Sequence, residues 1–339
     1  MNREGTWPPG RAEEVNERMA GKATESRAGF TSATERTDCA VVIVTYNSVH
    51  CIAGLLESLP AAARGLTVRV VVVDNGSSDD TVRVVRNSPD VTLVEMGTNL
   101  GYAGGINVGR RAVGSYSALL VLNPDVVLEE GSITRMHAAL SDPAVGIVVP
   151  TLIDAEGRRF RSLRREPTLS RAIGEGLLGD HMGGRPSWLS EMVRDEEAYQ
   201  IPHPVDWATG AVFLISAACD HMVGDWDERF FLYSEETDYA ARARAHGFRV
   251  EYLPAARAFH SGGGSGQSST LIALMAVNRI RYMEKHQGRA RAFRAAVILA
   301  ELARSRDSLH RVALRHLLRR SSWPALVDGK RAGATSAEA

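Results

Sequence analysis

Short apolar runs alternate with stretches of helical spacing along the first third of the chain. The β-branched and aliphatic runs predict strands at Val41–Val44, Val68–Val73, Val91–Glu95 and Ala118–Leu122. Between the first two runs, Val49–Leu59 carries apolar residues at helical spacing, and Thr81–Asn87 also fits a helix. Strands that alternate with helices predict an α/β fold, with a mostly parallel sheet covered by helices on both faces.

The second half of the chain is less uniform. Residues 151–204 are rich in basic and turn residues, which predicts a variable excursion around a binding face. A strand is expected in the WATGAVFLIS segment that follows Val205, after a Thr-Gly turn. Glu235–His246 then predicts a helix that Gly247 ends, and Arg249–Leu253 predicts a further strand.

Composition divides the chain into four segments. Residues 1–38 and 332–339 lack lasting periodicity and predict disorder, while 39–266 form the α/β domain. Residues 267–331 predict a basic helical extension, because Arg279–Arg331 holds fourteen Lys and Arg against four Asp and Glu. These helices could pack on the domain as a solvated pair, or present an amphipathic face to anionic lipid.

Charge and cysteine content limit the function classes. The 339 residues carry a formal net charge of zero, so nothing in the overall charge indicates nucleic acid as a partner. The three cysteines form neither a disulfide framework nor a zinc-binding spacing. No apolar secretory signal precedes the first strand, and the longest apolar run near the C-terminus is too short to span a bilayer. We therefore expect a cytoplasmic protein, either free or bound peripherally to the cytoplasmic face of the membrane.

Polar residues follow the predicted strands at the edge where ligands of such sheets bind. Asp74 ends the second strand, and its carboxylate could accept hydrogen bonds from a nucleotide base or a ribose, although Asp-Asn-Gly is also simply a good turn. Thr45, Tyr46 and Asn47 end the first strand and would form the opposite wall of the same pocket. With Asn75, these residues are the candidate nucleotide contacts.

The glycine-rich segment Asn99–Gly109 is a weaker candidate. It does not fit the dinucleotide fingerprint GxGxxG and does not follow the first strand, which argues against a dehydrogenase. We expect a turn that leads into a helix whose amide end faces phosphate, with Gly104 and Asn107 as donor contacts.

A metal site is predicted where the fourth strand ends. Asn123 and Asp125 stand there, and a divalent ion on a strand-end carboxylate would neutralise a diphosphate leaving group. Such a ligand set suits Mg²⁺ or Mn²⁺, which keep several non-protein ligands. His260 could be a further ligand, or contact the diphosphate directly, because it follows a strand and precedes SGGGSG in what looks like an exposed, flexible loop.

Three acids at the start of a predicted helix are candidates for base chemistry. They are Glu235, Glu236 and Asp238. Neighbouring like charges raise one pKa of such a cluster, which suits a general base, whereas a helix start is also often acidic for dipole reasons. Asp238 and Arg242 are four residues apart and can pair, which would make Asp238 a support.

As an ordered set, these motifs closely resemble the inverting GT-A glycosyltransferases of family 2, especially the bacterial rhamnosyltransferase-like branch. The resemblance covers about residues 40–260. It implies a GT-A fold with a Rossmann-like sheet and flanking helices, and it gives nucleotide binding to Thr45, Tyr46, Asp74 and Asn75. Asn-Pro-Asp stands where relatives often have Asp-x-Asp, so Asp125 would hold the metal, with His260 as a further ligand. Glu236 stands at the base position, where relatives usually have the shorter Asp.

The implied activity is metal-dependent transfer of a sugar with inversion. By this resemblance, the donor would be dTDP-L-rhamnose and the acceptor a hydroxyl of a glycan or a polyprenyl-linked carrier. A UDP-sugar donor and a non-catalytic sugar-nucleotide binder are the alternatives. A nucleotidyltransferase would need a glycine-rich basic loop after the first strand, where this chain has TYNS.

Overall fold

The computed structural model describes residues 36–178, 186–262, 268–288 and 290–331. The predicted disordered segments therefore lie almost wholly outside the described residues. The exception is at the first boundary, because the first strand begins at Thr37 rather than after residue 38. The backbone amide of Thr37 donates to Ser115, and that of Asp38 donates to the Thr67 hydroxyl, so pairing extends the strand beyond its apolar run.

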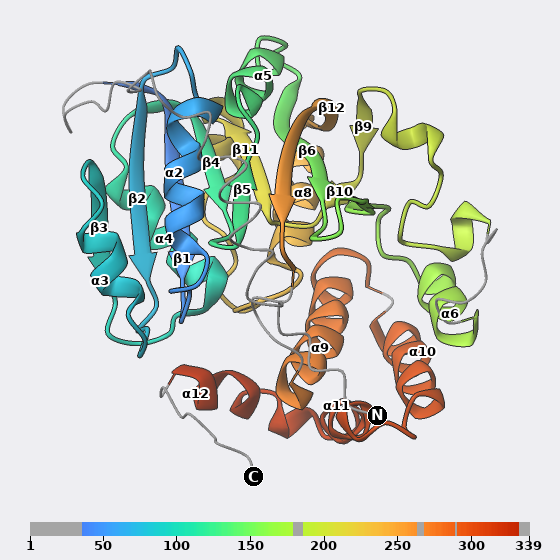
Figure 1. The fold of residues 1–339 in the computed structure, drawn as a ribbon. Helices are drawn as coiled ribbons and strands as arrows, with labels where there is room; N and C mark the ends of the chain where they lie inside the picture. Colours follow the sequence, from blue (N-terminus) through green and yellow to red (C-terminus); the bar gives the residue numbers. More distant parts are fainter. Residues whose placement is uncertain (1–35, 179–185, 263–267, 289, 332–339) are drawn as a thin grey trace.

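The elements alternate as predicted in the first half and become irregular afterwards (Figure 1). The strands are β1 (Thr37–Thr45), β2 (Val68–Asp74), β3 (Val91–Glu95), β4 (Tyr116–Leu122), β5 (Val126–Leu128), β6 (Val145–Ile153), β7 (Arg159–Phe160), β8 (Leu163–Arg164), β9 (His203–Val205), β10 (Trp207–Ala208), β11 (Val212–Ser216) and β12 (Arg249–His260). The α-helices are α2 (Ile52–Ala62), α3 (Thr81–Arg86), α4 (Gly101–Ala112), α5 (Ser132–Ala139), α6 (Leu169–Leu178), α7 (Ala217–Val223), α8 (Glu235–Ala245), α9 (Ser269–His286), α10 (Ala290–Ala303), α11 (Ser308–Leu318) and α12 (Ala325–Arg331). Short 3₁₀ helices lie at Ser187–Leu189, Glu197–Tyr199 and Arg320–Ser322.

The central sheet is mixed rather than wholly parallel. Its order is β3-β2-β1-β4-β11-β6-β12-β5, and the first four strands are parallel. β11 runs antiparallel to both β4 and β6, and β5 runs antiparallel to β12. A strand buried on both faces has the same apolar pattern in either direction, so the sequence could not reveal the reversal.

Alternate residues of the central strands feed two separate cores. Val41 and Ile43 of β1 face the core beneath α2, α3 and α5. Val42 and Val44 face the opposite core, which contains residues of α4, α7 and α8. Helices therefore cover both faces of the sheet, as its apolar strands require.

The predicted boundaries hold for short elements and shift in longer ones. β3 spans Val91–Glu95 as predicted, and α8 ends before Gly247, whose φ of 88° only glycine adopts easily. α2 begins at Ile52 instead of Val49, because Ser48 closes a turn by accepting the amides of Cys51 and Ile52. β12 continues to His260, seven residues beyond the predicted end at Leu253, through a register shift against β6.

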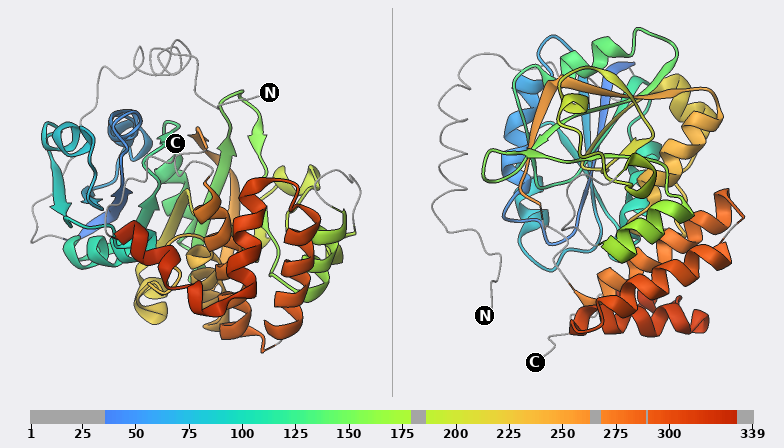
Figure 2. Two further views of the ribbon diagram at one scale, coloured as in Figure 1. Left: turned by 90° about the horizontal axis from the view of Figure 1, so that it is seen from below. Right: turned by 90° about the vertical axis from the view of Figure 1, so that its right-hand side faces the viewer.

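The C-terminal helices pack on the domain as a layer of their own (Figure 2). Buried residues of α9, α10, α11 and α12 form a third apolar cluster that also takes in Phe230, Phe231 and Ala172. Of the two alternatives for the basic extension, the structure therefore shows packing on the domain for these buried faces. Among the described residues, every helix is too short or too polar to cross a membrane.

Candidate active site

The carboxyl ends of β1 and β2 meet in a tightly bonded pair of loops. Thr45 and Asp74 are direct neighbours in the parallel register, and the Thr45 hydroxyl donates to Asp74 Oδ1 over 2.9 Å. The carboxylate of Asp74 also accepts from the amides of Gly76 and Ser77, at 3.1 and 2.8 Å, and from the Ser77 hydroxyl at 2.5 Å. Asp74 is buried, so it fixes the shape of the loop before any ligand arrives.

The residues beside Asp74 differ in what they leave available. Asn47 has a left-handed backbone (φ 52°), and its side-chain oxygen accepts the Ser78 amide over 2.8 Å. The Asn75 amide group donates to the Gly101 carbonyl over 2.9 Å, but its buried Oδ1 has no hydrogen-bond partner within the described part of the chain. The Tyr46 ring is 36% exposed. Asn75 Oδ1 and the Tyr46 ring are thus the groups of this loop pair that a ligand could use.

The amide end of α4 does not match its prediction. The Gly101 amide donates to the Asn99 side chain over 2.8 Å, and the Tyr102 amide donates to the Phe231 carbonyl over 2.6 Å. These donors are already satisfied inside the protein, so they do not face a phosphate. The helix end instead joins the glycine-rich segment to the loop that precedes Glu235.

Gly104 and Asn107 lie on a side of α4 that packs against residues 226–228. The Asn107 side chain donates to the Trp226 carbonyl and to Glu228, each at 2.9 Å, and accepts the Trp226 amide at 2.9 Å. A Cβ on Gly104 would meet Leu100 at 2.8 Å. A donor-binding role for Gly104 and Asn107 stays a prediction, and these contacts give both residues a packing role instead.

Asp125 and His260 face each other across the antiparallel pair β5–β12. His260 pairs with Val126, and its Nε2 lies 3.3 Å from Asp125 Oδ1. His260 is the last residue of β12 and is mostly buried, which corrects the expectation of an exposed loop. Asn123 lies at the same corner, and its backbone amide donates to the Ala211 carbonyl over 3.0 Å.

The Asp125–His260 pair has the donor chemistry of a small divalent-ion site. Burial alone would raise the pKa of Asp125, but the hydrogen bond and charge of His260 outweigh it and hold that pKa below its ordinary value. Across residues 36–331, outside the undescribed gaps, no group of three or more His, Cys, Asp or Glu side chains is placed to hold a metal ion. Two protein ligands still fit Mg²⁺ or Mn²⁺, which commonly take most of their ligands from water and substrate phosphates.

Glu235, which is buried, and Glu236, which is half-buried, start α8 as neighbouring like charges. One carboxylate oxygen of each is buried without a hydrogen-bond partner in the described structure. Burial raises the pKa of Glu236 to about 7, while the Thr237 and Gly210 amides hold it down. Burial and the charge of Glu236 raise the pKa of Glu235 well above its ordinary value. The two pKa values are therefore raised together, and Glu236 reaches a value near the pH at which a general base works.

Asp238 has a different environment from the two glutamates. Its carboxylate is fully buried and meets Lys285 at 2.6 Å, His286 at 2.7 Å and Arg242 at 2.9 Å. Burial raises the pKa of Asp238, but these partners outweigh it and lower the pKa overall. The predicted Asp238–Arg242 pair is present, and the carboxylate is bound to α9 rather than available to a substrate.

Tyr102 brings these groups together, and the sequence did not single it out. Its hydroxyl donates to the Gly210 carbonyl over 3.3 Å, and a Cβ on Gly210 would lie 3.3 Å from Glu236 Cβ. Burial raises the pKa of Tyr102 well above its ordinary value, and the charges of Glu235, Glu236 and Asp125 raise it further. Tyr102 therefore lies beside Gly210 and within the negative field of Glu235, Glu236 and Asp125. The Thr-Gly turn at Gly210 was the available signal, because a glycine often marks close approach.

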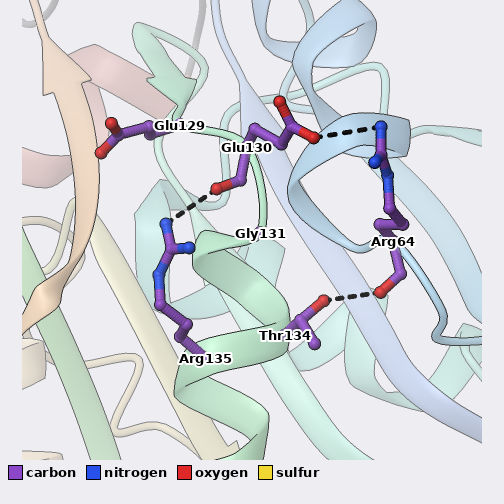
Figure 3. Close-up of a pocket in the computed structure, with 6 residues that line it drawn as sticks. All are labelled: Arg64, Glu129, Glu130, Gly131, Thr134 and Arg135. Carbon is purple, nitrogen blue, oxygen red and sulfur yellow. Dashed lines mark hydrogen bonds and ion pairs between the residues drawn. The ribbon is translucent and has the colours of Figure 1, made fainter.

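A separate cavity lies at the other edge of the sheet (Figure 3). Its volume is about 510 Å³, and it is lined by Arg64, Glu129, Glu130, Gly131, Thr134 and Arg135. Two of its charges pair with each other, Arg64 with Glu130 at 3.0 Å. Its lining residues come just after α2 and β5 in the chain and at the start of α5. None of the predicted site residues lines it.

Comparisons with known proteins identify the family of this chain. The model of glycosyl transferase family 2 matches residues 40–201. An N-acetylglucosaminyl-diphospho-decaprenol L-rhamnosyltransferase of Mycobacterium tuberculosis (strain CDC 1551 / Oshkosh) is 30% identical over 305 residues, which cover 86% of this chain and 98% of the relative. The low-salt glycan biosynthesis hexosyltransferase Agl10 of Haloferax volcanii is 29% identical over 232 residues, covering 66% of this chain and 67% of Agl10.

The fold agrees as well. The crystal structure of GalNAc-T7 with UDP, GalNAc and Mn²⁺ matches with a TM-score of 0.52 at 14% identity, covering 84% of this chain and 57% of that one. The likeness concerns the fold alone, which is the GT-A fold of an α/β glycosyltransferase with a mixed, mostly parallel sheet. With a relative matched over nearly its whole length, the chain belongs to glycosyl transferase family 2 and is a glycosyltransferase.

Proposed function

We propose that this glycosyltransferase moves L-rhamnose from a dTDP donor to a hydroxyl of a polyprenyl-linked glycan, with inversion and with a bound divalent ion. Glu236 is the general base in this proposal, and Asp125 and His260 are the metal ligands. Thr45, Tyr46, Asp74, Asn75 and Asn123 shape the donor site.

The state of Glu236 is the single observation that carries this proposal. It combines a buried carboxylate oxygen without a partner, a pKa raised to about 7, and a place beside Gly210 and Tyr102. Asp74 and Asp238 differ, because hydrogen bonds or ion pairs occupy both carboxylate oxygens of each. A base works best with a pKa near the working pH, and Glu236 meets that condition.

Transfer requires one proton to move and one bond to be exchanged. The acceptor hydroxyl gives its proton to Glu236 as its oxygen attacks the anomeric carbon from the face opposite the nucleotide. The bond from that carbon to the diphosphate breaks, and the diphosphate leaves with the electron pair. Glu235 lies beside Glu236, and its negative charge favours proton uptake by the pair.

Asp125 and His260 would hold Mg²⁺ or Mn²⁺ beside the diphosphate. When bound, the ion neutralises the negative charge that the leaving diphosphate gains. The side chains of the two residues lie 3.3 Å apart, so one ion could bind both the carboxylate of Asp125 and the neutral imidazole nitrogen of His260.

The choice of sugar and acceptor is supported by the relatives rather than by the site. The Mycobacterium tuberculosis relative is named as a rhamnosyltransferase that acts on a diphospho-decaprenol-linked sugar. An acceptor of that kind is held in a membrane, so the enzyme would work at the cytoplasmic face. The outer side of α11 suits an anionic lipid surface, because Leu318 (60% exposed) lies between the exposed Arg315 and Arg319 along the chain.

The experiment is a transfer assay with the purified full-length chain. It would use dTDP-L-rhamnose and UDP-sugars as donors, a polyprenyl-diphospho-N-acetylglucosamine acceptor, and Mg²⁺, Mn²⁺ or a chelator. We expect dTDP-L-rhamnose to be consumed with the metal and the product to have the inverted anomeric configuration. Transfer from UDP-sugars only would replace the donor, and metal-dependent binding without transfer from any donor would indicate a non-catalytic binder.

A further inference from the structure

The loop from Phe230 to Ser234, directly before the Glu235–Glu236 pair, has an unusual backbone. Phe231, Tyr233 and Ser234 have φ angles of 62°, 71° and 69°. Non-glycine residues with positive φ are uncommon, and three within four positions persist only where surrounding contacts impose them. We call residues 230–234 the base loop.

One side chain of α9 accounts for much of this constraint. The Asn278 amide group donates to the carbonyls of Phe230, Leu232 and Tyr233, at 2.5, 2.8 and 3.0 Å. Asn278 is fully buried, and its own oxygen accepts from Arg281 over 2.9 Å. The Asn278 amide group serves three carbonyls of this loop at once. Water could not easily take its place, because the site is closed to solvent.

The glycine-rich segment holds the other side of the base loop. The Phe231 carbonyl accepts the Tyr102 amide over 2.6 Å, and a Cβ on Gly101 would lie only 2.4 Å from that carbonyl oxygen. Gly101 has a φ of 78°, and its carbonyl accepts the Asn75 side chain. A continuous series of hydrogen bonds therefore runs from the donor loop through α4 to the base loop, and on to α9.

From these contacts we infer that Asn278 is a positioning residue for Glu236, so that the C-terminal extension is part of the catalytic apparatus. This inference rests on the proposed role of Glu236. One oxygen of each glutamate has no hydrogen-bond partner, and the Glu236 carboxylate is held by the backbone amides of Thr237 and Gly210. The position of the backbone at the start of α8 therefore sets the position of the base. Without Asn278 the base loop relaxes toward ordinary φ angles and carries Glu236 away from the acceptor hydroxyl.

The test is Asn278→Leu, which keeps the side-chain size and removes the three donated hydrogen bonds. We expect kcat to fall about 10- to 100-fold, the usual effect of a misplacement near 1 Å, with donor affinity unchanged. Hydrogen exchange at residues 230–236 should become faster. The matched control is Leu317→Ala, which opens the same apolar cluster on α11 without touching Asn278. It should lower the melting temperature while kcat and exchange in the base loop stay at wild-type values.

The outcomes separate this inference from the proposed function. If Asn278→Leu and Leu317→Ala lose stability alike and both keep wild-type kcat and base-loop exchange, Asn278 only supports the fold and the inference is overturned. Glu236→Gln is measured beside them. Near-normal turnover in Glu236→Gln would remove the base assignment, while faster base-loop exchange in Asn278→Leu would still show that Asn278 holds the loop.

Discussion

The two acidic sites of this enzyme are built by opposite means. On the donor side, Asp74 accepts four hydrogen bonds from Thr45, Gly76 and Ser77. On the base side, Glu235 and Glu236 each keep a buried oxygen without a partner, at the end of a loop with a strained backbone. The difference therefore lies in the immediate contacts of each carboxylate.

The difference follows from what each carboxylate has to do. A group that shapes a binding loop must stay in place, and hydrogen bonds from the Gly76 and Ser77 amides hold the Asp74 carboxylate there. A base must exchange a proton near neutral pH, and at Glu236 burial raises the pKa by more than the backbone amides lower it. The fold therefore stabilises Asp74 directly, whereas it fixes Glu236 through backbone contacts and leaves the carboxylate reactive.

The largest expected effect is the loss of the base. Glu236→Gln keeps the shape of the side chain but cannot accept a proton, so turnover should fall by about two to four decades with donor affinity retained. Glu236→Asp should keep substantial activity, and Glu235→Gln should cost less than Glu236→Gln. Turnover and donor affinity of the three variants check this. Near-normal turnover in Glu236→Gln beside an inactive Glu235→Gln would move the base to Glu235.

Removal of the metal ligand should have the next largest effect. Asp125→Ala takes away the carboxylate that the described residues place beside His260, so metal-dependent donor affinity should fall, on the order of 10- to 100-fold. Calorimetry with dTDP in the presence of Mn²⁺ or of a chelator measures the difference. Donor affinity without metal should match the wild type, and an unchanged metal dependence would contradict the assignment of Asp125.

The pH dependence of turnover should follow Glu236. Its pKa is raised to about 7, so the active, ionised form is lost as the pH falls below that value. We expect kcat to fall about tenfold per pH unit below 7 and to level off above it. A pH profile between 5 and 9 checks this, with circular dichroism as a control for folding. A plateau that extends down to pH 5 would exclude a base with this pKa.

Much of the donor side follows from sequence, because its signals are local. Val68–Val73 predicts a strand, the next residue must emerge at the sheet edge, and Asp74 lies there as expected. The antiparallel direction of β11 could not be predicted, because a buried strand has the same apolar pattern in either direction. The base side follows only in part, because its constraints come from distant residues. Asn278 is 48 residues beyond Phe230. A single polar residue on an apolar helix does not reveal from the sequence which backbone carbonyls its side chain will bind.

A pair of matched substitutions should give stability changes of opposite sign. Asp74→Asn places an amide donor against backbone donors, so it should lower the free energy of unfolding by about 1–3 kcal/mol. The pKa of folded Glu236 is raised from 4.5 to about 7, so its stabilising contribution is complete below 4.5 and is lost as the pH rises through 7. Glu236→Gln mimics the neutral acid and should therefore stabilise the fold at pH 8, on the order of 1–3 kcal/mol, and hardly at all at pH 4.5.

Urea unfolding of both variants at pH 4.5 and pH 8 measures these changes. If Asp74→Asn left stability unchanged, the hydrogen bonds around Asp74 would not shape the loop as the structure suggests. If Glu236→Gln destabilised the fold at pH 8, the folded protein would favour the ionised carboxylate. The pKa of Glu236 would then not be raised by folding.

The smallest expected effect concerns the outer face of the C-terminal helices. Since α9 holds the base loop, truncation of the extension would disturb the active site, and charge reversal is the better change. Arg311 and Arg315 are exposed on α11, and each cation near an anionic surface contributes roughly 1 kcal/mol. Replacing both with Glu should weaken flotation with anionic vesicles in low salt and leave donor affinity unchanged. The matched control reverses Arg83 and Arg86, which are exposed on α3. Equal flotation of the two double variants would show that net charge, and not the α11 face, attracts the enzyme to lipid.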